Sequence, residues 1–213
     1  MTSRPISFPP GAFRRRDEED DRLFYATPRL VVHLDPGALV ALAALHARLV
    51  PVRGNVLDLM SSWRTHLPPA FEGTVIGLGL NREEMGANAR LAQALVHDLN
   101  REPKLPFNDA AFDAVLCAVS VQYLTQPVEV FREARRILRP GGPFVVSFSN
   151  RCFPDKAVAL WQAANDAQHA AIVAAYFAAS DDEGEGGWSA LDEYAYTPDE
   201  GDPLWAVWAT RCA

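Results

Sequence analysis

Apolar residues are arranged from residue 55 onward in short runs that alternate with segments of helical periodicity. Runs typical of strands cover residues 55–60, 74–80, 92–99, 112–119 and 144–148. The fourth run is apolar almost throughout, which is typical of a parallel strand covered on both faces. Two later apolar segments, 188–196 and 204–211, have no helical pattern between them, so they are predicted to be antiparallel neighbours.

Helical periodicity is clearest in two segments. Asp35 and Pro36 form an N-cap and first-turn signal, and leucines follow at helical spacing. An amphipathic helix is expected after Thr125 as its cap, with Pro127 in its first turn, and Pro140-Gly141-Gly142 ends it. The remaining helical stretches are predicted at 82–91 and 157–179, the latter with a break near Asp166.

Strands that alternate with helices predict an α/β fold with a doubly wound, mostly parallel sheet and helices on both faces. The last pair of strands predicts an antiparallel strand near one edge. In such sheets, ligands bind beyond the carboxyl ends of the strands. Residues 1–50 are expected to form an N-terminal arm and a lid-like helix, and residues 51–213 to form the main domain. The acidic stretch 181–187 is predicted to be a loop.

Composition narrows the class of protein. The chain has 213 residues, of which 49% are hydrophobic and 22% are charged, as in a globular protein. The net charge is −7, and the basic run 14–16 is answered by acids at 17–21. We therefore expect a solvated, mobile arm there and no nucleic-acid contact. Three scattered cysteines predict free thiols in a reducing compartment. No signal peptide or membrane span is predicted, which favours a cytoplasmic protein.

Several kinds of chemistry have no motif in the chain. The five histidines are scattered without the spacing of metal ligands, so no metal site is predicted. G-x-S-x-G, a P-loop and G-x-G-x-x-G after the first strand are all absent from the sequence. A serine hydrolase and a dinucleotide dehydrogenase are therefore disfavoured.

Two stretches of the chain carry a family resemblance. Residues 105–115 contain LPF followed by FDAV, and residues 131–142 have the sequence FREARRILRPGG. Together they resemble the type 11 branch of the class I S-adenosylmethionine-dependent methyltransferases, and weaker similarity extends from about Asn55 to the C-terminus. The resemblance implies a Rossmann-like sheet of order 3-2-1-4-5-7-6. It also implies S-adenosylmethionine as cofactor, bound over strands 1, 2 and 4, and S-adenosylhomocysteine as product.

The resemblance further implies which residues hold the cofactor. Asp58 matches the acid that ends strand 1, and Asp98 matches the acid that usually meets the adenine amino group. The glycine-rich turn after strand 1 is replaced by Met60-Ser61-Ser62-Trp63, and Gly79 stands where an acid usually binds the ribose hydroxyls. The implied cofactor-binding residues are Asp58, Met60, Ser61, Ser62, Gly79, Leu80, Asn81, Asp98, Leu99 and Ser120.

These departures change the expected chemistry of binding. Serine gives up the clearance that glycine allows, but Ser61 and Ser62 can bond the cofactor's carboxylate beside a helix N-terminus. Asn81 can bond the ribose hydroxyls about half as strongly as a carboxylate, and Glu84 can lend the missing charge. Structural roles stay open as well. Asp58 can cap a helix, and Asn81 with Glu84 forms a capping-box pattern.

The acceptor side is less defined. Methyl transfer mainly requires alignment of donor and acceptor, and a general base is needed only where the acceptor holds a proton. Residues expected on this side follow strands 4 and 5 or form a lid before the first helix: Tyr25, Arg29, His33, Gln122, Tyr123, Asn150 and Arg151. Arg151 can bind an acidic group or face solvent.

A methyltransferase acting on a small molecule is therefore expected. One alternative is a catalytically degenerate methyltransferase fold that serves as a binding or regulatory module, and another is a Rossmann-like enzyme that uses a different nucleotide.

Overall fold

The computed structural model describes residues 6–181 and 187–213. Its centre is a seven-stranded sheet of order β3-β2-β1-β4-β5-β7-β6. Strands β1 to β5 are parallel to one another, and β7 is antiparallel to both β5 and β6. The strands are Asn55–Leu59 (β1), Thr74–Gly79 (β2), Gln93–Val96 (β3), Ala114–Ala118 (β4), Pro143–Phe148 (β5), Asp192–Tyr196 (β6) and Leu204–Thr210 (β7). The predicted sheet, its order and its antiparallel strand are confirmed.

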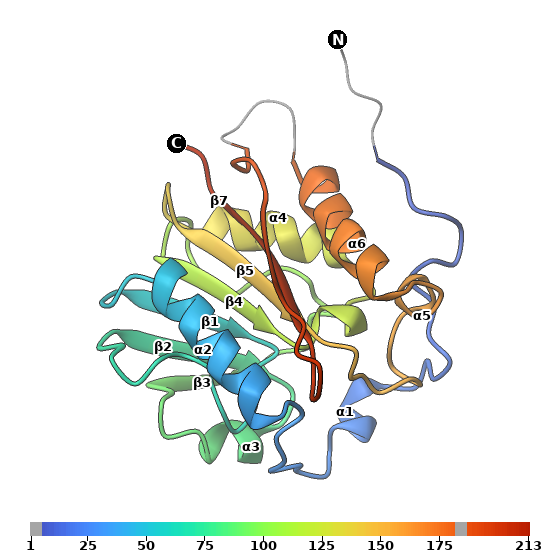
Figure 1. Cartoon of the computed structure of the whole chain (residues 1–213), viewed down its shortest axis with the longest axis horizontal. Helices are drawn as coiled ribbons and strands as arrows, with labels where there is room; N and C mark the ends of the chain where they lie inside the picture. Colours follow the sequence, from blue (N-terminus) through green and yellow to red (C-terminus); the bar gives the residue numbers. More distant parts are fainter. Residues whose placement is uncertain (1–5, 182–186) are drawn as a thin grey trace.

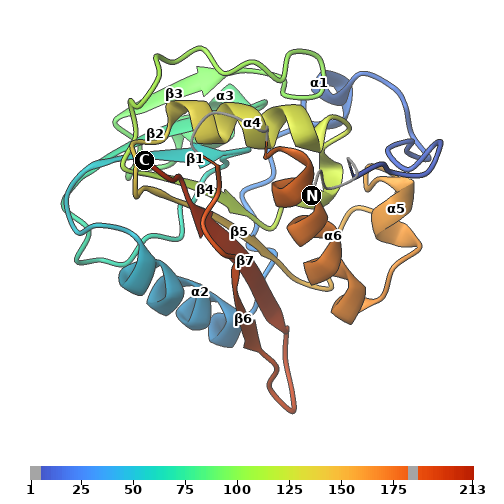
Figure 2. The same cartoon turned by 90° about the horizontal axis from the view of Figure 1, so that it is seen from above.

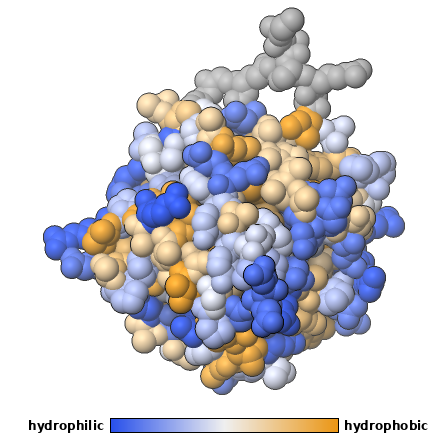
Figure 3. Space-filling view, viewed as in Figure 1, coloured by the Kyte–Doolittle hydropathy of each residue, from blue (hydrophilic) through white to orange (hydrophobic). Residues whose placement is uncertain are grey.

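Helices cover both faces of this sheet. They are α1 (Asp21–Phe24), α2 (Pro36–Leu49), α3 (Arg82–Gly86), α4 (Pro127–Ile137), α5 (Ala159–Gln162), α6 (Asp166–Ala179) and the short 3-10 turn η1 (Val121–Tyr123). Helix α2 lies on one face, and α4 and α6 lie on the other (Figures 1 and 2). Two buried apolar layers result, one under α4 and α6 and one under α2. Hydrophilic and hydrophobic residues are interspersed on the outer surface seen in Figure 3.

Local caps fix the ends of the two longest helices. The Asp35 carboxylate accepts a hydrogen bond from the amide of Ala38 at 2.8 Å, as the N-cap signal before α2 predicts. Helix α6 begins at a reciprocal capping box between Asn165 and Gln168. The predicted break near Asp166 is thereby confirmed.

Two predicted helix boundaries are wrong. Helix α4 has Gln126 at its N-cap position, without a side-chain cap, while the Thr125 hydroxyl donates to Asn100 Oδ1 at 3.1 Å. Helix α3 ends at Gly86, before the predicted residue 91. The Asn88 amide donates to the Ser62 carbonyl at 3.0 Å, and such side-chain to backbone bonding competes with helix continuation.

The chain after β1 also differs from expectation. A helix was expected beside Ser61 and Ser62, but residues 60–73 form an irregular segment. Leu67 and Phe71 of this segment are buried in the apolar layer under α2. Their side chains occupy the space over the sheet that a helix would otherwise cover, so no helix begins directly after the two serines.

The N-terminal arm is not solvated as predicted. Arg15 forms an ion pair with Asp21 at 2.7 Å, and their side chains are only 6% and 4% exposed. The ammonium group of Lys156 is fully buried and contacts Asp17 at 2.8 Å and Asp21 at 3.1 Å. Arg15, Asp17 and Asp21 of the arm therefore find partners inside the fold, and the bonds to Lys156 hold the arm against the loop between β5 and α5.

Helix α2 packs on the sheet through Ala38, Ala41 and Leu42, which meet Leu204 of β7. The division at residue 50 stays a prediction. The predicted loop at 181–187 lies mostly outside the described residues. Among the helices of the described chain, none is long and apolar enough to cross a membrane.

Candidate cofactor and acceptor site

The carboxyl ends of β1, β2 and β4 and the chain after β3 border one cavity of about 590 Å³. Residues 20–35, which we call the lid segment, form another part of its wall. This volume is within the range of small-molecule sites. The predicted residues that line the cavity are Tyr25, Arg29, His33, Asp58, Met60, Ser61, Ser62, Gly79, Leu80, Asn81, Asp98, Leu99, Ser120, Tyr123 and Arg151.

Two predicted acceptor-side residues lie elsewhere. Gln122 is fully buried, and its amide donates to the Val119 carbonyl at 3.0 Å. Asn150 is exposed and accepts a hydrogen bond from the Ser149 hydroxyl at 3.3 Å. Neither residue is part of the cavity wall, because the chain turns sharply after β4 and again after β5.

Asp58 ends β1 at the floor of the cavity. Its side chain accepts a hydrogen bond from the Ser61 hydroxyl at 2.7 Å. Burial raises the pKa of Asp58 to about 6, and the bond from Ser61 opposes that rise. A buried carboxyl group with a pKa of about 6 is ionised at neutral pH, and the resulting carboxylate can bind a cationic group of a ligand.

The backbone is strained where β1 and β4 end. Met60 has a φ of 55° and Val119 a φ of 49°, in the left-handed region that L-residues rarely adopt. Such conformations cost about 1–3 kcal/mol each and often occur at functional sites. Both residues line the cavity.

The end of β2 has no space for the expected acid. A Cβ atom added at Gly79 would overlap the carbonyl oxygen of Ser61, because the irregular segment after β1 runs directly across this strand. The Ser61 amide also donates to the Leu78 carbonyl at 2.9 Å. Glycine at position 79 is therefore required by close backbone packing, and a carboxylate cannot be placed there without movement of residues 60–62.

Asn81 and Glu84 are engaged by the chain itself. The Asn81 amide donates to the Tyr25 carbonyl at 2.8 Å, and its oxygen caps α3 by accepting from the Glu84 amide at 2.9 Å. The Glu84 carboxylate accepts from the Arg29 amide at 2.7 Å and from the Ser62 hydroxyl at 2.6 Å. The structural interpretation of Asn81 as a cap is confirmed, and both side chains also hold the lid segment.

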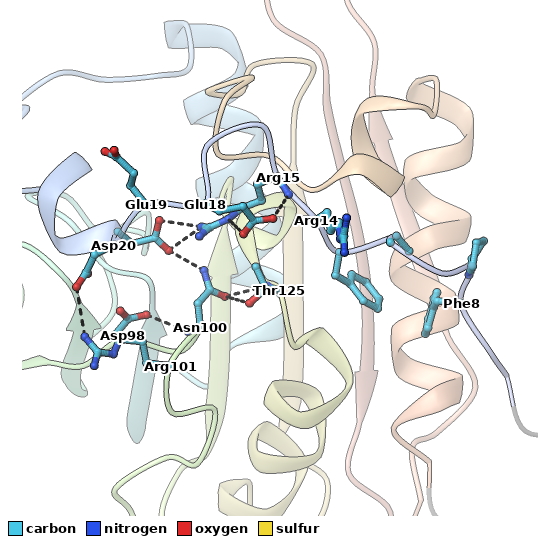
Figure 4. Close-up of a pocket in the computed structure, with 15 residues that line it drawn as sticks. Phe8, Arg14, Arg15, Glu18, Glu19, Asp20, Asp98, Asn100, Arg101 and Thr125 are labelled. Atoms are coloured by element: carbon cyan, nitrogen blue, oxygen red, sulfur yellow. Dashed lines mark hydrogen bonds and ion pairs between the residues drawn. The ribbon is translucent and has the colours of Figure 1, made fainter.

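Two further residues that the sequence did not single out for this purpose secure the lid segment. The Trp63 indole donates to the Val31 carbonyl at 2.8 Å. Asn100 donates to Asp21 at 2.9 Å and accepts from the Thr125 amide at 2.8 Å (Figure 4). These contacts join positions far apart in the sequence, and neither has a local sequence signal.

Asp98 lies where the cavity meets a second hollow. That hollow is also about 590 Å³ and lies between the N-terminal arm and the residues after β3 (Figure 4). Asp98 accepts a hydrogen bond from the Asn100 amide at 3.0 Å, which closes a turn. The carboxylate thus closes a turn and also borders the cavity.

The acceptor-side wall is largely aromatic. The Tyr123 hydroxyl accepts from the Phe153 amide at 2.9 Å, and burial raises the pKa of Tyr123 to about 12. The pKa of His33 is lowered by burial, which favours the neutral imidazole. Arg151 is 64% exposed and pairs with Asp202 at 2.8 Å. The phenol of Tyr123 therefore keeps its proton, and the neutral imidazole of His33 is the group on this wall that can accept one from a ligand.

The residues that line the cavity can be compared with the chemical groups of S-adenosylmethionine. Asp58 suits the ammonium group of its amino-acid end, and Asp98 suits an adenine amino group as hydrogen-bond acceptor. At the ribose end Gly79 has no side chain, and the two oxygens of Glu84 already accept one hydrogen bond each from the chain. The residues fit the cofactor at its two ends. Within the described ranges, no group of three His, Cys, Asp or Glu residues could hold a metal ion.

A sheet of order 3-2-1-4-5-7-6 with an antiparallel seventh strand, and a cavity at the ends of β1, β2 and β4, define the class I methyltransferase fold. Residues 61–146 match the family model described as a methyltransferase domain, type 11. The resemblance to class I S-adenosylmethionine-dependent methyltransferases is thereby confirmed.

Individual relatives agree with this family. The chain is 31% identical over 129 residues to the ubiquinone/menaquinone biosynthesis C-methyltransferase UbiE of Bartonella henselae, which covers 56% of this chain and 48% of the relative. The chain thus spans about half the length of the curated relatives it matches.

Solved structures show the same fold. A SAM dependent methyltransferase from Aquifex aeolicus has a TM-score of 0.53 at 16% identity, covering 83% of this chain and 94% of that one. Phosphoethanolamine N-methyltransferase 2 of Haemonchus contortus, solved with S-adenosyl-L-methionine, has a TM-score of 0.54 at 13% identity, covering 84% and 53%.

Proposed function

We propose that this chain transfers a methyl group from S-adenosylmethionine to a small-molecule acceptor. The observation that carries the proposal is the cavity at the ends of β1, β2 and β4, with the buried carboxyl group of Asp58 on its wall, inside a methyltransferase fold. When bound, the cofactor supplies a methyl group on a cationic sulphur, which an acceptor attacks in line.

The chain's own residues would then bind and align the two reactants. Asp58 receives the ammonium group of the cofactor, and Asp98 accepts from its adenine amino group. The lid segment covers the cavity and excludes water, and the rings of Tyr25, Tyr123 and Phe153 hold the acceptor beside the donor. Such alignment supplies much of the rate gain in a displacement of this type. For an acceptor that holds a proton, neutral His33 is the base on the wall.

Isothermal titration calorimetry with S-adenosylmethionine and S-adenosylhomocysteine tests this proposal. Both ligands are expected to bind, and Asp58→Ala should weaken binding by at least about tenfold, or about 1.4 kcal/mol. Glu83→Ala is the matched control, because Glu83 is an exposed acid outside the cavity wall. No heat with either ligand at millimolar concentration would reject the proposal.

A second candidate function is a binding or regulatory module that has lost catalysis. It is favoured by the end of β2, where Gly79 excludes an acid and Glu84 is committed to the lid segment. Under this alternative, a folded Asp58→Ala variant keeps its affinity for S-adenosylhomocysteine or neither protein binds it. The same calorimetric series therefore separates a chain that binds the cofactor through Asp58 from a module that has lost this binding.

A further inference from the structure

Arg29 of the lid segment has its guanidinium group among three aromatic rings at the cavity wall. The central carbon of the group lies 4.6 Å from the centre of the Phe24 ring, 5.6 Å from that of Phe153 and 5.9 Å from that of Tyr25. One nitrogen, Nη2, donates to the Phe24 carbonyl at 3.0 Å. The group is thus held in one place by ring stacking and a single hydrogen bond.

The charge of Arg29 has no counter-ion in the described part of the chain. Its Nη1 atom is buried without a hydrogen-bond partner, and its side chain forms no ion pair among residues 6–181 and 187–213. Two other cations near the cavity are paired, Arg151 with Asp202 and Arg15 with Asp21. Glu84 accepts hydrogen bonds from the backbone amide of Arg29 and from Ser62, but it forms no ion pair with the Arg29 guanidinium within the described ranges.

An unpaired, partly buried cation is costly to a fold. Burial of a charge without a partner is strongly unfavourable, and cation–π contacts offset only part of that cost. A guanidinium group is planar and matches a carboxylate with two parallel hydrogen bonds. A ligand that brings a carboxylate into the cavity would therefore supply the missing charge and the missing acceptor.

We infer that Arg29 binds a carboxylate of the methyl acceptor, so that the acceptor is a small organic acid with an aromatic or apolar body. This inference rests on the proposed function. The position of Arg29 supports the acceptor as the source of the carboxylate. The Arg29 guanidinium lies by Phe153, which follows β5. Asp58 is in β1, and β4 lies between β1 and β5 in the sheet. The apolar body would lie against the rings of Tyr123 and Phe153.

Benzoate and its neutral analogue benzamide test the inference by calorimetry on protein saturated with S-adenosylhomocysteine. Benzoate should bind, and benzamide should bind at least about tenfold more weakly. Arg29→Met should reduce benzoate affinity by about tenfold or more, since it keeps the length of the side chain and removes the charge. Arg64→Met is the control, because Arg64 also lines the cavity but is exposed. Arg29→Gln serves if the methionine variant does not fold by circular dichroism.

A second arm distinguishes the source of the carboxylate. S-adenosylhomocysteine carries a carboxylate and 5′-methylthioadenosine does not. If Arg29→Met leaves the affinity for both unchanged and weakens benzoate, the acceptor is the source. If Arg29→Met weakens the binding of S-adenosylhomocysteine by about tenfold but not that of 5′-methylthioadenosine or benzoate, Arg29 binds the cofactor's carboxylate. The assignment to the acceptor is then overturned.

The remaining outcomes separate this inference from the proposed function. Equal binding of benzoate and benzamide, unaltered benzoate binding in Arg29→Met, or no benzoate binding by the wild type each overturns the inference while leaving cofactor binding intact. Binding of benzoate through Arg29 in a protein that takes up no S-adenosylhomocysteine would support a carboxylate site and reject the methyltransferase proposal.

Discussion

The charge of Asp58 should change with pH near its pKa of about 6. Its pKa of about 6 in the folded chain exceeds the ordinary value of 3.8. The folded state therefore binds more protons than the unfolded state between these two values, and stability should fall as pH rises from about 4 to about 6 and then stay level. Asp58→Asn removes this loss and should raise the free energy of unfolding at pH 7 by up to about 3 kcal/mol.

Urea denaturation of the wild type and of Asp58→Asn, near pH 4 and at pH 7, measures this difference. The two proteins should be closer in stability at the lower pH. Asparagine still accepts the hydrogen bond from Ser61, so the comparison isolates the charge. A difference between the two proteins that does not change with pH would contradict a raised pKa.

Gly79 is a residue where a small change should have a large effect. Gly79→Ala places a Cβ against the Ser61 carbonyl, so the segment after β1 must shift, at a cost of about 1–3 kcal/mol in unfolding free energy. Gly86→Ala is the control, because a Cβ there has nothing within 4 Å and alanine favours the helix. Chemical denaturation compares the two variants, and equal stability would show that residues 60–62 yield freely. Gly79→Asp, which restores the family's acid, should also destabilise the chain.

The sequence predicted individual residues well where a motif or a local cap carried the signal. Asp58 and Asp98 were placed beside the cavity by family motifs, and Asn81 was expected as a cap. The second role of Asn81 could not be predicted, because its amide meets Tyr25, which is 56 positions away in the chain. Glu84 meets the Arg29 amide across 55 positions for the same reason. Local patterns carry no information about such partners.

The lid segment is an element without regular structure beyond α1, held by hydrogen bonds from the main domain. Asn81→Asp should keep the cap of α3 and lose the donor to the Tyr25 carbonyl, at a cost of about 1 kcal/mol. Amide hydrogen exchange in residues 25–33 should then become about fivefold faster. Asn165→Asp is the control, since Asn165 caps α6 and lies outside the lid contacts. Exchange that responds equally to both variants would mean that Asn81 does not hold the lid.

Whole elements were predictable where their boundaries are set locally. Helix α2 follows from Asp35 and Pro36, and α6 begins at a capping box beside the predicted break near Asp166. The missing helix after β1 could not be predicted in the same way. Leu67 and Phe71 fill the space over the sheet where that helix would lie, and their burial depends on packing against α2 and the sheet. The early end of α3 likewise depends on the bond from Asn88 to the Ser62 carbonyl.

The molecule as a whole joins its N-terminal arm to the sheet through buried charges. In the sequence, the basic run 14–16 is adjacent to the acidic run 17–21. This pattern predicts that the two runs neutralise each other in water. In the fold, Lys156 is drawn in from a distant loop, because the carboxylates of Asp17 and Asp21 and the carbonyl of Glu19 surround its ammonium group. Asp21 also borders the cavity and binds Asn100, so the same charges connect the arm to the candidate site.

Lys156→Met tests whether the arm folds as one unit with the sheet. It removes the buried cation from Asp17 and from Asp21, and Asp21 keeps Arg15 as its partner, so the unfolding free energy should fall by about 1–3 kcal/mol in chemical denaturation. Lys104→Met, at an exposed lysine, should change it by no more than about 0.5 kcal/mol. The arm should also be released locally, and hydrogen exchange in residues 17–33 should accelerate in Lys156→Met alone. If both lysine variants lose the same small amount, the arm is attached independently of the core. The lid segment would then be free to open without any cost to the sheet that bears Asp58.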